Sequence, residues 1–231
     1  MLGQLEERGG RPEAARAAYA AGLKRCADCV PLWRAAAALE ERSGALAKAR
    51  ALLEQARLRN PKTPELWLAA IRTEQRAPGG AGSRAAEALL AKALQDCPTS
   101  GPLWAEAIAM APRPARKTKS ADALKRCDSD AHVVAAVATL FWGDRKNDKA
   151  RAWFARAVAL DPDNGDFWAL YFRFEQQHGG GPEAAANVAR RCAAADPRHG
   201  ERWTAVSKAP ANAHQPVDAI LRKVAAELEA P

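Results

Sequence analysis

Two cysteines three positions apart, Cys26 and Cys29, have the spacing most closely associated with chemistry in this sequence. A CxxC pair can supply two zinc ligands or a redox-active dithiol. Zinc requires two further ligands at matching spacing, and a thioredoxin-like site requires a strand–helix–strand setting. Neither accompanies the pair. We therefore interpret Cys26 and Cys29 as thiols at a helix end and expect no metal site.

The acidic segment 161–166, with the sequence DPDNGD, has the oxygen-rich composition of a calcium-binding loop. An EF-hand loop needs glycine at its sixth position and a bidentate glutamate at its twelfth. Here the glycine is fifth, and the twelfth residue is Phe172. We therefore expect this segment to be a turn that caps the helix containing Trp168.

No spacing typical of catalysis is present. The sequence lacks the HExxH pattern of zinc proteases and the GxxxxGK[ST] loop that cradles phosphates. Its four histidines are scattered along the chain between His132 and His214. These absences predict a protein that is not an enzyme, binds no cofactor and has no small-molecule substrate.

One charged segment remains as a candidate partner-binding site. Residues 113–126 contain six basic residues and the single acid Asp122, so this segment carries five of the eight excess positive charges of the chain. The basic residues are Arg113, Arg116, Lys117, Lys119, Lys125 and Arg126. Such a run is as often a solvated connector as a binding site. The alternative is a strip of accessible side chains that docks an acidic protein segment or an RNA backbone. Pro112 and Pro114 interrupt the helical pattern, which predicts an irregular hairpin here.

The elements that position these residues follow from the tryptophans. Trp recurs at steps of 34, 37, 64 and 35 residues, where 64 is close to two periods: Trp33, Trp67, Trp104, Trp168 and Trp203. Val134 occupies the slot of the missing copy. A period of about 34 residues is typical of arrays of helical hairpins, which must stack to bury their apolar faces. Because the tryptophans share a helix face with Ala and Leu, we expect them to fill space between helices rather than to stack on nucleic-acid bases.

The hairpin over residues 30–63 shows the pattern most clearly. Pro31 suits the opening turn of a helix, where its missing N–H costs nothing. Gly44 suits a left-handed helix end, and Asn60 before a proline is expected to stop the second helix. Since this pattern repeats, we predict an all-α fold, an α-solenoid of helical hairpin repeats.

We divide the chain into seven units. They are a partial repeat at 1–29, repeats at 30–63 and 64–100, a degenerate repeat with the basic segment at 101–129, repeats at 130–163 and 164–198, and a C-terminal repeat or cap at 199–231. The array begins abruptly, without a polar capping turn. We therefore expect Met1 to start a fragment or an incomplete gene model.

Three features recur within these units. An aromatic residue opens the first helix, an acid follows seven residues later, and Ala-Arg stands early in the second helix, at Ala15-Arg16, Ala49-Arg50 and Ala150-Arg151. Together they resemble HAT repeats, the "half-a-TPR" motifs of RNA-processing proteins. The ordinary TPR pattern is a weaker match, because its small residues and Tyr are not regularly placed. We therefore predict an α-solenoid of HAT/TPR-like helical hairpin repeats.

Longer stretches resemble the C-terminal HAT array of the pre-mRNA-processing factor 6 family. The resemblance is carried by residues 113–154, 164–179 (NGDFWALYFRFEQQHG) and 196–208 (DPRHGERWTAVSK), and it extends upstream through 56–77. It implies a non-catalytic scaffold in the nucleus that bridges small nuclear ribonucleoproteins of the spliceosomal tri-snRNP. Its implied partners are spliceosomal proteins, with RNA contact indirect or weak.

Two other binding functions stay open. A TPR-type chaperone adaptor would need a clamp of Lys, Asn and Arg at repeat-equivalent positions, which we do not find. A HAT-repeat protein of another complex that binds RNA directly would need basic residues in many repeats, whereas here they concentrate in one. No apolar run approaches the roughly 20 residues of a membrane span, so we expect no membrane partner. Five cysteines without a disulfide pattern indicate an intracellular protein.

Overall fold

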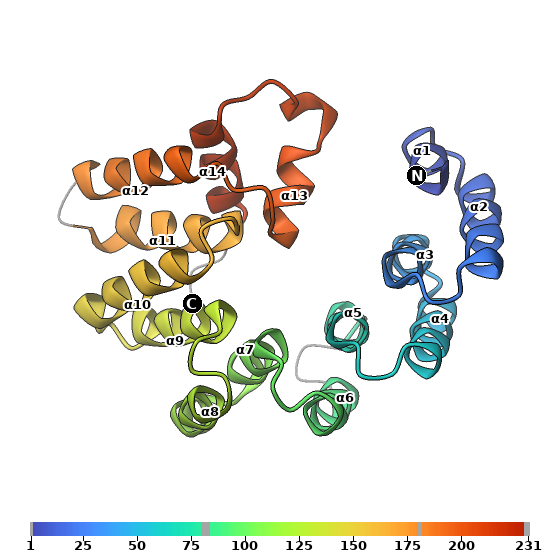
Figure 1. Cartoon of the computed structure of the whole chain (residues 1–231), viewed down its shortest axis with the longest axis horizontal. Coiled ribbons are helices and arrows are strands. Elements are labelled where there is room, and N and C mark those ends of the chain that lie inside the picture. The colour runs from blue at the N-terminus through green and yellow to red at the C-terminus, as the bar shows by residue number, and fades with distance from the viewer. Residues whose placement is uncertain (1, 80–83, 180–181, 229–231) are drawn as a thin grey trace. The chain divides into compact units, whose positions relative to one another are not determined.

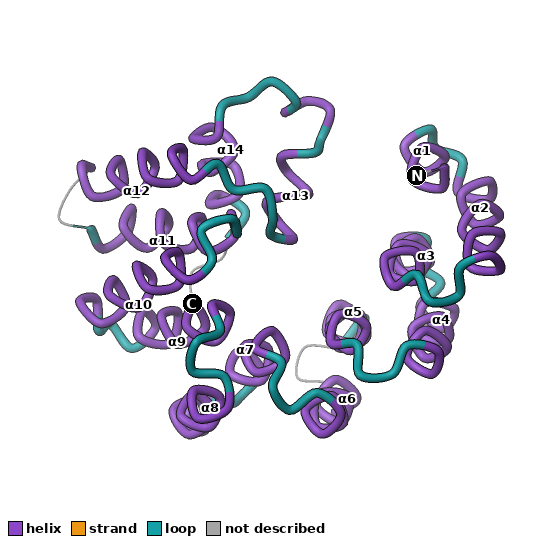
Figure 2. The backbone as a smooth tube through the Cα atoms, in the orientation of Figure 1, coloured by secondary structure: helices purple, strands orange, loops and turns teal. Residues whose placement is uncertain are grey.

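The computed structural model describes residues 2–79, 84–179 and 182–228. Within these ranges the regular elements are α-helices and one 3-10 turn, and the only strand-like feature is an isolated bridge between Asn164 and His199 (Figures 1 and 2). The predicted all-α fold, an α-solenoid of HAT/TPR-like repeats, is confirmed.

The chain divides into two compact units, Met1–Met110 and Ala111–Pro231. The first contains α1 (Leu2–Arg8), α2 (Pro12–Arg25), α3 (Val30–Arg42), α4 (Leu46–Arg59), α5 (Pro64–Arg76), α6 (Arg84–Asp96) and α7 (Gly101–Met110). The second contains α8 (Arg113–Arg126), α9 (Ala131–Gly143), α10 (Asn147–Leu160), α11 (Gly165–His178), α12 (Pro182–Ala195), α13 (Glu201–Ser207), the 3-10 turn Pro210–Asn212 and α14 (Val217–Ala226). The division falls inside the predicted unit 101–129, between α7 and α8.

Consecutive helices of the first unit pack against one another. α1 packs on α2, α3 on α4 and α5 on α6, and the hairpins are joined because α2 also packs on α3 and α4 on α5. Local sequence sets the ends of these helices as predicted. Pro31 lies in the first turn of α3, Gly44 takes a left-handed φ of 76° just beyond the C-cap of that helix, and Asn60 caps the end of α4.

The core of the second unit is larger and richer in aromatic side chains. It runs from α9 through α14, and its completely or almost completely buried residues include Phe154, Phe172 and Phe174. Trp142 joins them through edge-on contacts, with ring centroids 6.1 Å from Phe154 and 5.8 Å from Phe174. Val134, which fills the missing tryptophan slot, is fully buried in this core.

The prolines at 112 and 114 act differently from our expectation. The first helix of that hairpin, α7, is indeed short, with 10 residues. The basic segment, however, is not irregular. It forms the continuous 14-residue helix α8, with Pro112 as its N-cap and Pro114 in its first turn. A proline there starts a helix rather than breaking it, because the first N–H groups of a helix have no intrahelical acceptor.

Among the described residues, no helix combines the length and the apolar composition needed to cross a membrane.

Candidate interaction surfaces

The repeated tryptophans lie in the interior of the helix stacks, with exposed fractions of 8% or less. In three of them the indole N–H donates a hydrogen bond to the main-chain oxygen six residues earlier. These bonds are 2.6 Å from Trp33 to Ala27, 2.8 Å from Trp104 to Pro98, and 2.8 Å from Trp168 to Pro162. Each ring therefore fixes the turn that precedes its own helix. The five tryptophans hold the repeats together and leave little ring surface for a partner.

An arginine–glutamate pair joins successive hairpins at three places. In each pair the arginine lies in the second helix of one hairpin, and the glutamate lies 24 residues later in the first helix of the next. The Nε–Oε1 distances are 2.7 Å for Arg16–Glu40, 2.7 Å for Arg50–Glu74 and 2.6 Å for Arg151–Glu175. We call these pairs the inter-repeat clamps.

The clamp glutamates are buried although their arginines reach solvent. The Glu175 side chain is 2% exposed, whereas that of Arg151 is 36% exposed. Hydrogen bonding to Glu175 raises the pKa of Arg151, and hydrogen bonding to Glu74 likewise raises that of Arg50. In each clamp the glutamate is the acid that follows a repeated tryptophan by seven residues, and the arginine is that of the Ala-Arg motif. The sequence motif contains both residues of each pair, and their constant spacing of 24 is the signal in the sequence that marks them as partners.

The remaining junctions between hairpins lack both members of the clamp. Aligning the second helices places Glu87, Lys117 and Ala186 at the arginine position, and the residues 24 later are Ala111, Phe141 and Pro210. The arginine and the glutamate are therefore either both present or both absent in this chain. This co-occurrence is expected if a buried glutamate is tolerated only beside its cation.

The predicted partner-binding residues form a basic surface on α8. Arg113, Lys117, Lys119, Lys125 and Arg126 are exposed, and Arg116 is partly buried. Ser120 and Ala123 form the buried side of the same helix, which packs against α9. We call the six basic residues the α8 basic strip. The segment is a helix rather than the irregular structure that we predicted, and its role in partner binding stays a prediction.

Two members of the strip have structural contacts of their own. Arg116 donates from Nε to the main-chain oxygen of Ala111 at 3.0 Å, and Lys117 Nζ lies 3.6 Å from Asp144 Oδ2. A hydrogen bond from Lys146, together with the charge of Lys117, lowers the pKa of Asp144. The side chains of Arg113, Lys119 and Lys125 make no such bond within the described ranges. They are therefore the three with which to test binding separately from folding.

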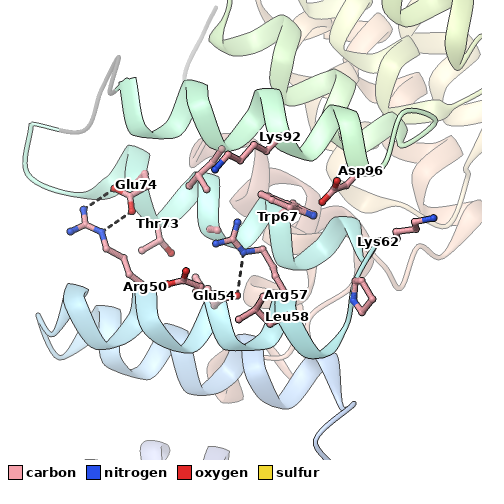
Figure 3. Close-up of a pocket in the computed structure, with 14 residues that line it drawn as sticks. Arg50, Glu54, Arg57, Leu58, Lys62, Trp67, Thr73, Glu74, Lys92 and Asp96 are labelled. Carbon is pink, nitrogen blue, oxygen red and sulfur yellow. Dashed lines mark hydrogen bonds and ion pairs between the residues drawn. The ribbon is translucent and has the colours of Figure 1, made fainter.

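A groove of about 620 Å³ lies on the first unit, between α4 and α6 and over α5 (Figure 3). Its floor includes Trp67, Ala70 and Glu74 from α5, and its walls include Arg57 of α4 and Lys92 of α6. Arg50 is held at one end by its clamp to Glu74. A second groove of about 470 Å³ lies one repeat earlier, between α2 and α4 and over α3. The repeat thus produces the same kind of groove twice.

The residues weighed as metal or redox groups have other roles. Cys26 caps the end of α2 and Cys29 precedes α3, and the described residues contain no group of three or more His, Cys, Asp or Glu that could hold a metal. Asn164 caps α11 by accepting from the Asp166 N–H at 3.2 Å, so the predicted capping turn is confirmed. Asp166 in turn accepts from the Trp203 N–H at 2.7 Å, which joins α11 to the start of α13.

Stacked hairpins, interior tryptophans and clamps between successive repeats define a helical-repeat protein of the TPR type. A family model described as tetratricopeptide repeat matches residues 30–73. Protein STABILIZED1 of Arabidopsis thaliana is 60% identical over 114 residues, which is 49% of this chain and 11% of that protein. Pre-mRNA-processing factor 6 of Homo sapiens is 53% identical over 117 residues, 51% of this chain and 12% of that protein.

The longest of these matches is to Pre-mRNA-splicing factor prp1 of Schizosaccharomyces pombe. It is 41% identical over 209 residues, covering 90% of this chain and 22% of that protein. The chain belongs to the pre-mRNA-processing factor 6 family, with HAT/TPR repeats. It spans between about a tenth and about a fifth of the length of these relatives.

Proposed function

We propose that this chain is part of a non-catalytic scaffold in pre-mRNA splicing, which acts in the nucleus and bridges small nuclear ribonucleoproteins of the tri-snRNP. The observation that carries this proposal is the 41% identity to a pre-mRNA-splicing factor over 90% of the chain. An identity of that extent spans nearly every hairpin, so it concerns the whole array rather than one helical repeat.

The architecture supports a scaffold because an array of hairpins exposes a large surface for its size. The partners would be spliceosomal proteins, with RNA contacts indirect or weak. The α8 basic strip is the surface we assign to this association. Residues 111–160 contain eleven Lys and Arg against five Asp and Glu, so this part of the chain favours acidic partner surfaces.

Affinity purification from nuclear extract tests the proposal, with identification of both proteins and RNAs. Proteins and small nuclear RNAs of the tri-snRNP should be enriched over an unrelated helical-repeat bait. Nuclease treatment should release the RNAs and leave the proteins bound. If no tri-snRNP component is enriched, the bridging role is wrong. If nuclease removes the proteins as well, the chain is an RNA-binding solenoid instead.

The strip is tested by changing Arg113, Lys119 and Lys125 together to Glu. These side chains are exposed, so the fold should be retained. Recovery of the particle should fall and become more sensitive to salt, because exposed charge contacts are screened.

The matched control changes Arg25, Arg34 and Lys48 to Glu. These three residues are exposed in the first unit, and the substitution alters the net charge by the same amount. The control should recover the particle like the wild type at every salt concentration. Equal loss in both variants would mean that only net charge matters, and equal recovery in both would remove the strip from the interface.

A further inference from the structure

The groove over α5 differs from its counterpart over α3 at several lining positions, one of which is occupied by Arg57. The two grooves share several aligned lining positions, with Trp67 in place of Trp33 and the clamp Arg50–Glu74 in place of Arg16–Glu40. Other positions differ, since Glu54 stands where the earlier groove has Ala20, and Leu58 where it has Lys24. At the position of the apolar Leu23 on α2, the later groove has Arg57 on α4. A cation has therefore replaced an aliphatic side chain at a lining position of a repeated groove.

Arg57 is held in the groove without a direct ion pair or hydrogen bond to an anion in the described structure, although the charges of Glu54 and Asp96 act on it from a distance. Its guanidinium carbon lies 4.3 Å from the centroid of the Trp67 ring, and its Nε donates to the Leu53 main-chain oxygen at 3.3 Å. Among the described residues, its terminal nitrogens have no hydrogen bond and no ion pair. The side chain is partly buried, and this burial lowers its pKa. A guanidinium that is stacked on an indole and partly desolvated is ready to bind a carboxylate through its unused fork.

The charges around Arg57 leave an excess of one positive charge. Lys62 and Lys92 also line the groove, and so do the acids Glu54 and Asp96. Figure 3 shows Arg57 in the middle of the groove and Lys92 reaching into it from α6. In the described structure these two lysines and two acids form no ion pair within 4.0 Å. Arg50 and Glu74 neutralise each other. The other charged residues of the lining are three cations, Arg57, Lys62 and Lys92, and two anions, Glu54 and Asp96.

Apolar surface adjoins the charged centre. Leu58 is 78% exposed at the edge of the groove, and Leu89 of α6 lines the opposite wall. An exposed leucine beside an unpaired arginine gives a partner two different kinds of contact within a short distance. The apolar contact supplies free energy by removing surface from water, and the arginine specifies position.

We propose that this groove binds a short segment of a partner protein, in which one Asp or Glu side chain pairs with Arg57 and the adjacent apolar side chains cover Leu58 and Leu89. The inference deepens the proposed scaffold function by assigning a second contact surface and the chemistry of its partner. A single carboxylate matches the excess of one positive charge. A phosphate, with a charge near −2, would exceed that charge and meet stronger repulsion from Glu54 and Asp96 than a carboxylate does.

A differential peptide selection tests this proposal. Phage-displayed random 12-residue peptides are selected on the wild-type chain after depletion on Arg57→Leu. Leucine is the residue at this position in the preceding groove, so the variant should fold, as circular dichroism and the thermal midpoint would verify. The recovered peptides should share an acidic residue flanked by apolar ones.

A recovered peptide is then synthesised with a fluorescein label and titrated by anisotropy. Changing its acidic residue to the corresponding amide should weaken binding about tenfold or more, as should Arg57→Leu, since each change removes a charge-assisted hydrogen bond. Lys48→Leu is the matched control, because Lys48 is an exposed cation of α4 outside the groove, and binding should be unchanged.

Three results would overturn the proposal. Selection could recover no peptide that distinguishes the wild type from Arg57→Leu. Binding could be indifferent to the change from acid to amide. A peptide with phosphoserine in place of the acid could bind more tightly, which would identify a phosphate site instead. Because the assay uses the purified chain and peptides alone, these results are independent of whether the chain associates with the tri-snRNP.

Discussion

Breaking the clamp between α10 and α11 should destabilise the second unit by more than its exposed arginine would suggest. Glu175 accepts hydrogen bonds from Arg151 Nε at 2.6 Å and from Nη2 at 3.2 Å, and its side chain is almost completely buried. Arg151→Ala removes both donors and the positive charge. It leaves a buried carboxylate without its cation, and the desolvation cost of that carboxylate is then uncompensated.

The expected cost lies between two limits. Removing one partner of a fully buried ion pair costs about 3–5 kcal/mol, and exposed pairs contribute about 0.2–1 kcal/mol. Since the Arg151 side chain is 36% exposed, water can partly replace it, and we expect a loss of about 2 kcal/mol for Arg151→Ala. The double variant Arg151→Ala/Glu175→Met also removes the stranded carboxylate. It should be more stable than Arg151→Ala alone, by about 1 kcal/mol.

Urea unfolding followed by circular dichroism measures these differences. The control is Arg190→Ala, because Arg190 pairs with Glu183 at 2.8 Å but both side chains are largely exposed. It should change stability by less than about 0.5 kcal/mol. Two outcomes would refute the reasoning: an Arg151→Ala variant as stable as this control, or a double variant less stable than Arg151→Ala.

Three further substitutions or modifications test other parts of the structure. Trp168→Ala should cost about 3–5 kcal/mol in urea unfolding, because it empties a buried aromatic site and removes the bond to Pro162. Gly165→Ala should also destabilise, by about 1–3 kcal/mol, because the added Cβ would lie 2.0 Å from a ring atom of Trp203; unchanged stability would show that the ring moves freely. Iodoacetamide at pH 8 should label the exposed Cys26 quickly and spare Cys192, since burial raises the pKa of the Cys192 thiol to about 12, and equal labelling by mass spectrometry would contradict this.

The sequence was sufficient for the helices and their repetition because both depend on local chemistry. Pro31, Gly44 and Asn60 act within a few residues of their own positions, and the tryptophan period follows from the stacking of similar hairpins. The error at α8 has a local cause as well. Two prolines and a run of cations were interpreted as irregular structure, whereas Pro114 lies in the first turn of a helix whose buried side includes Ala123.

The clamps and the groove could not be predicted in the same way. A clamp depends on how one hairpin is placed on the next, and neither Arg50 nor Glu74 indicates its partner by its neighbours in sequence. The groove requires walls from α4 and α6 and a floor from α5, so its lining is determined by packing. Arg57 stands out only after the two grooves are aligned and Leu23 is found at the same position.

The order of residues within each clamp has a consequence for synthesis on the ribosome. The arginine always precedes its glutamate by 24 residues, and it belongs to the helix that is completed first. While the next helix is still being made, the arginine remains hydrated on the outside of a finished hairpin, at little cost. The glutamate becomes buried only when its helix docks onto the preceding hairpin, where the arginine is already in place. Elongation from the N-terminus can therefore add one hairpin after another without forming a state in which a carboxylate is buried alone.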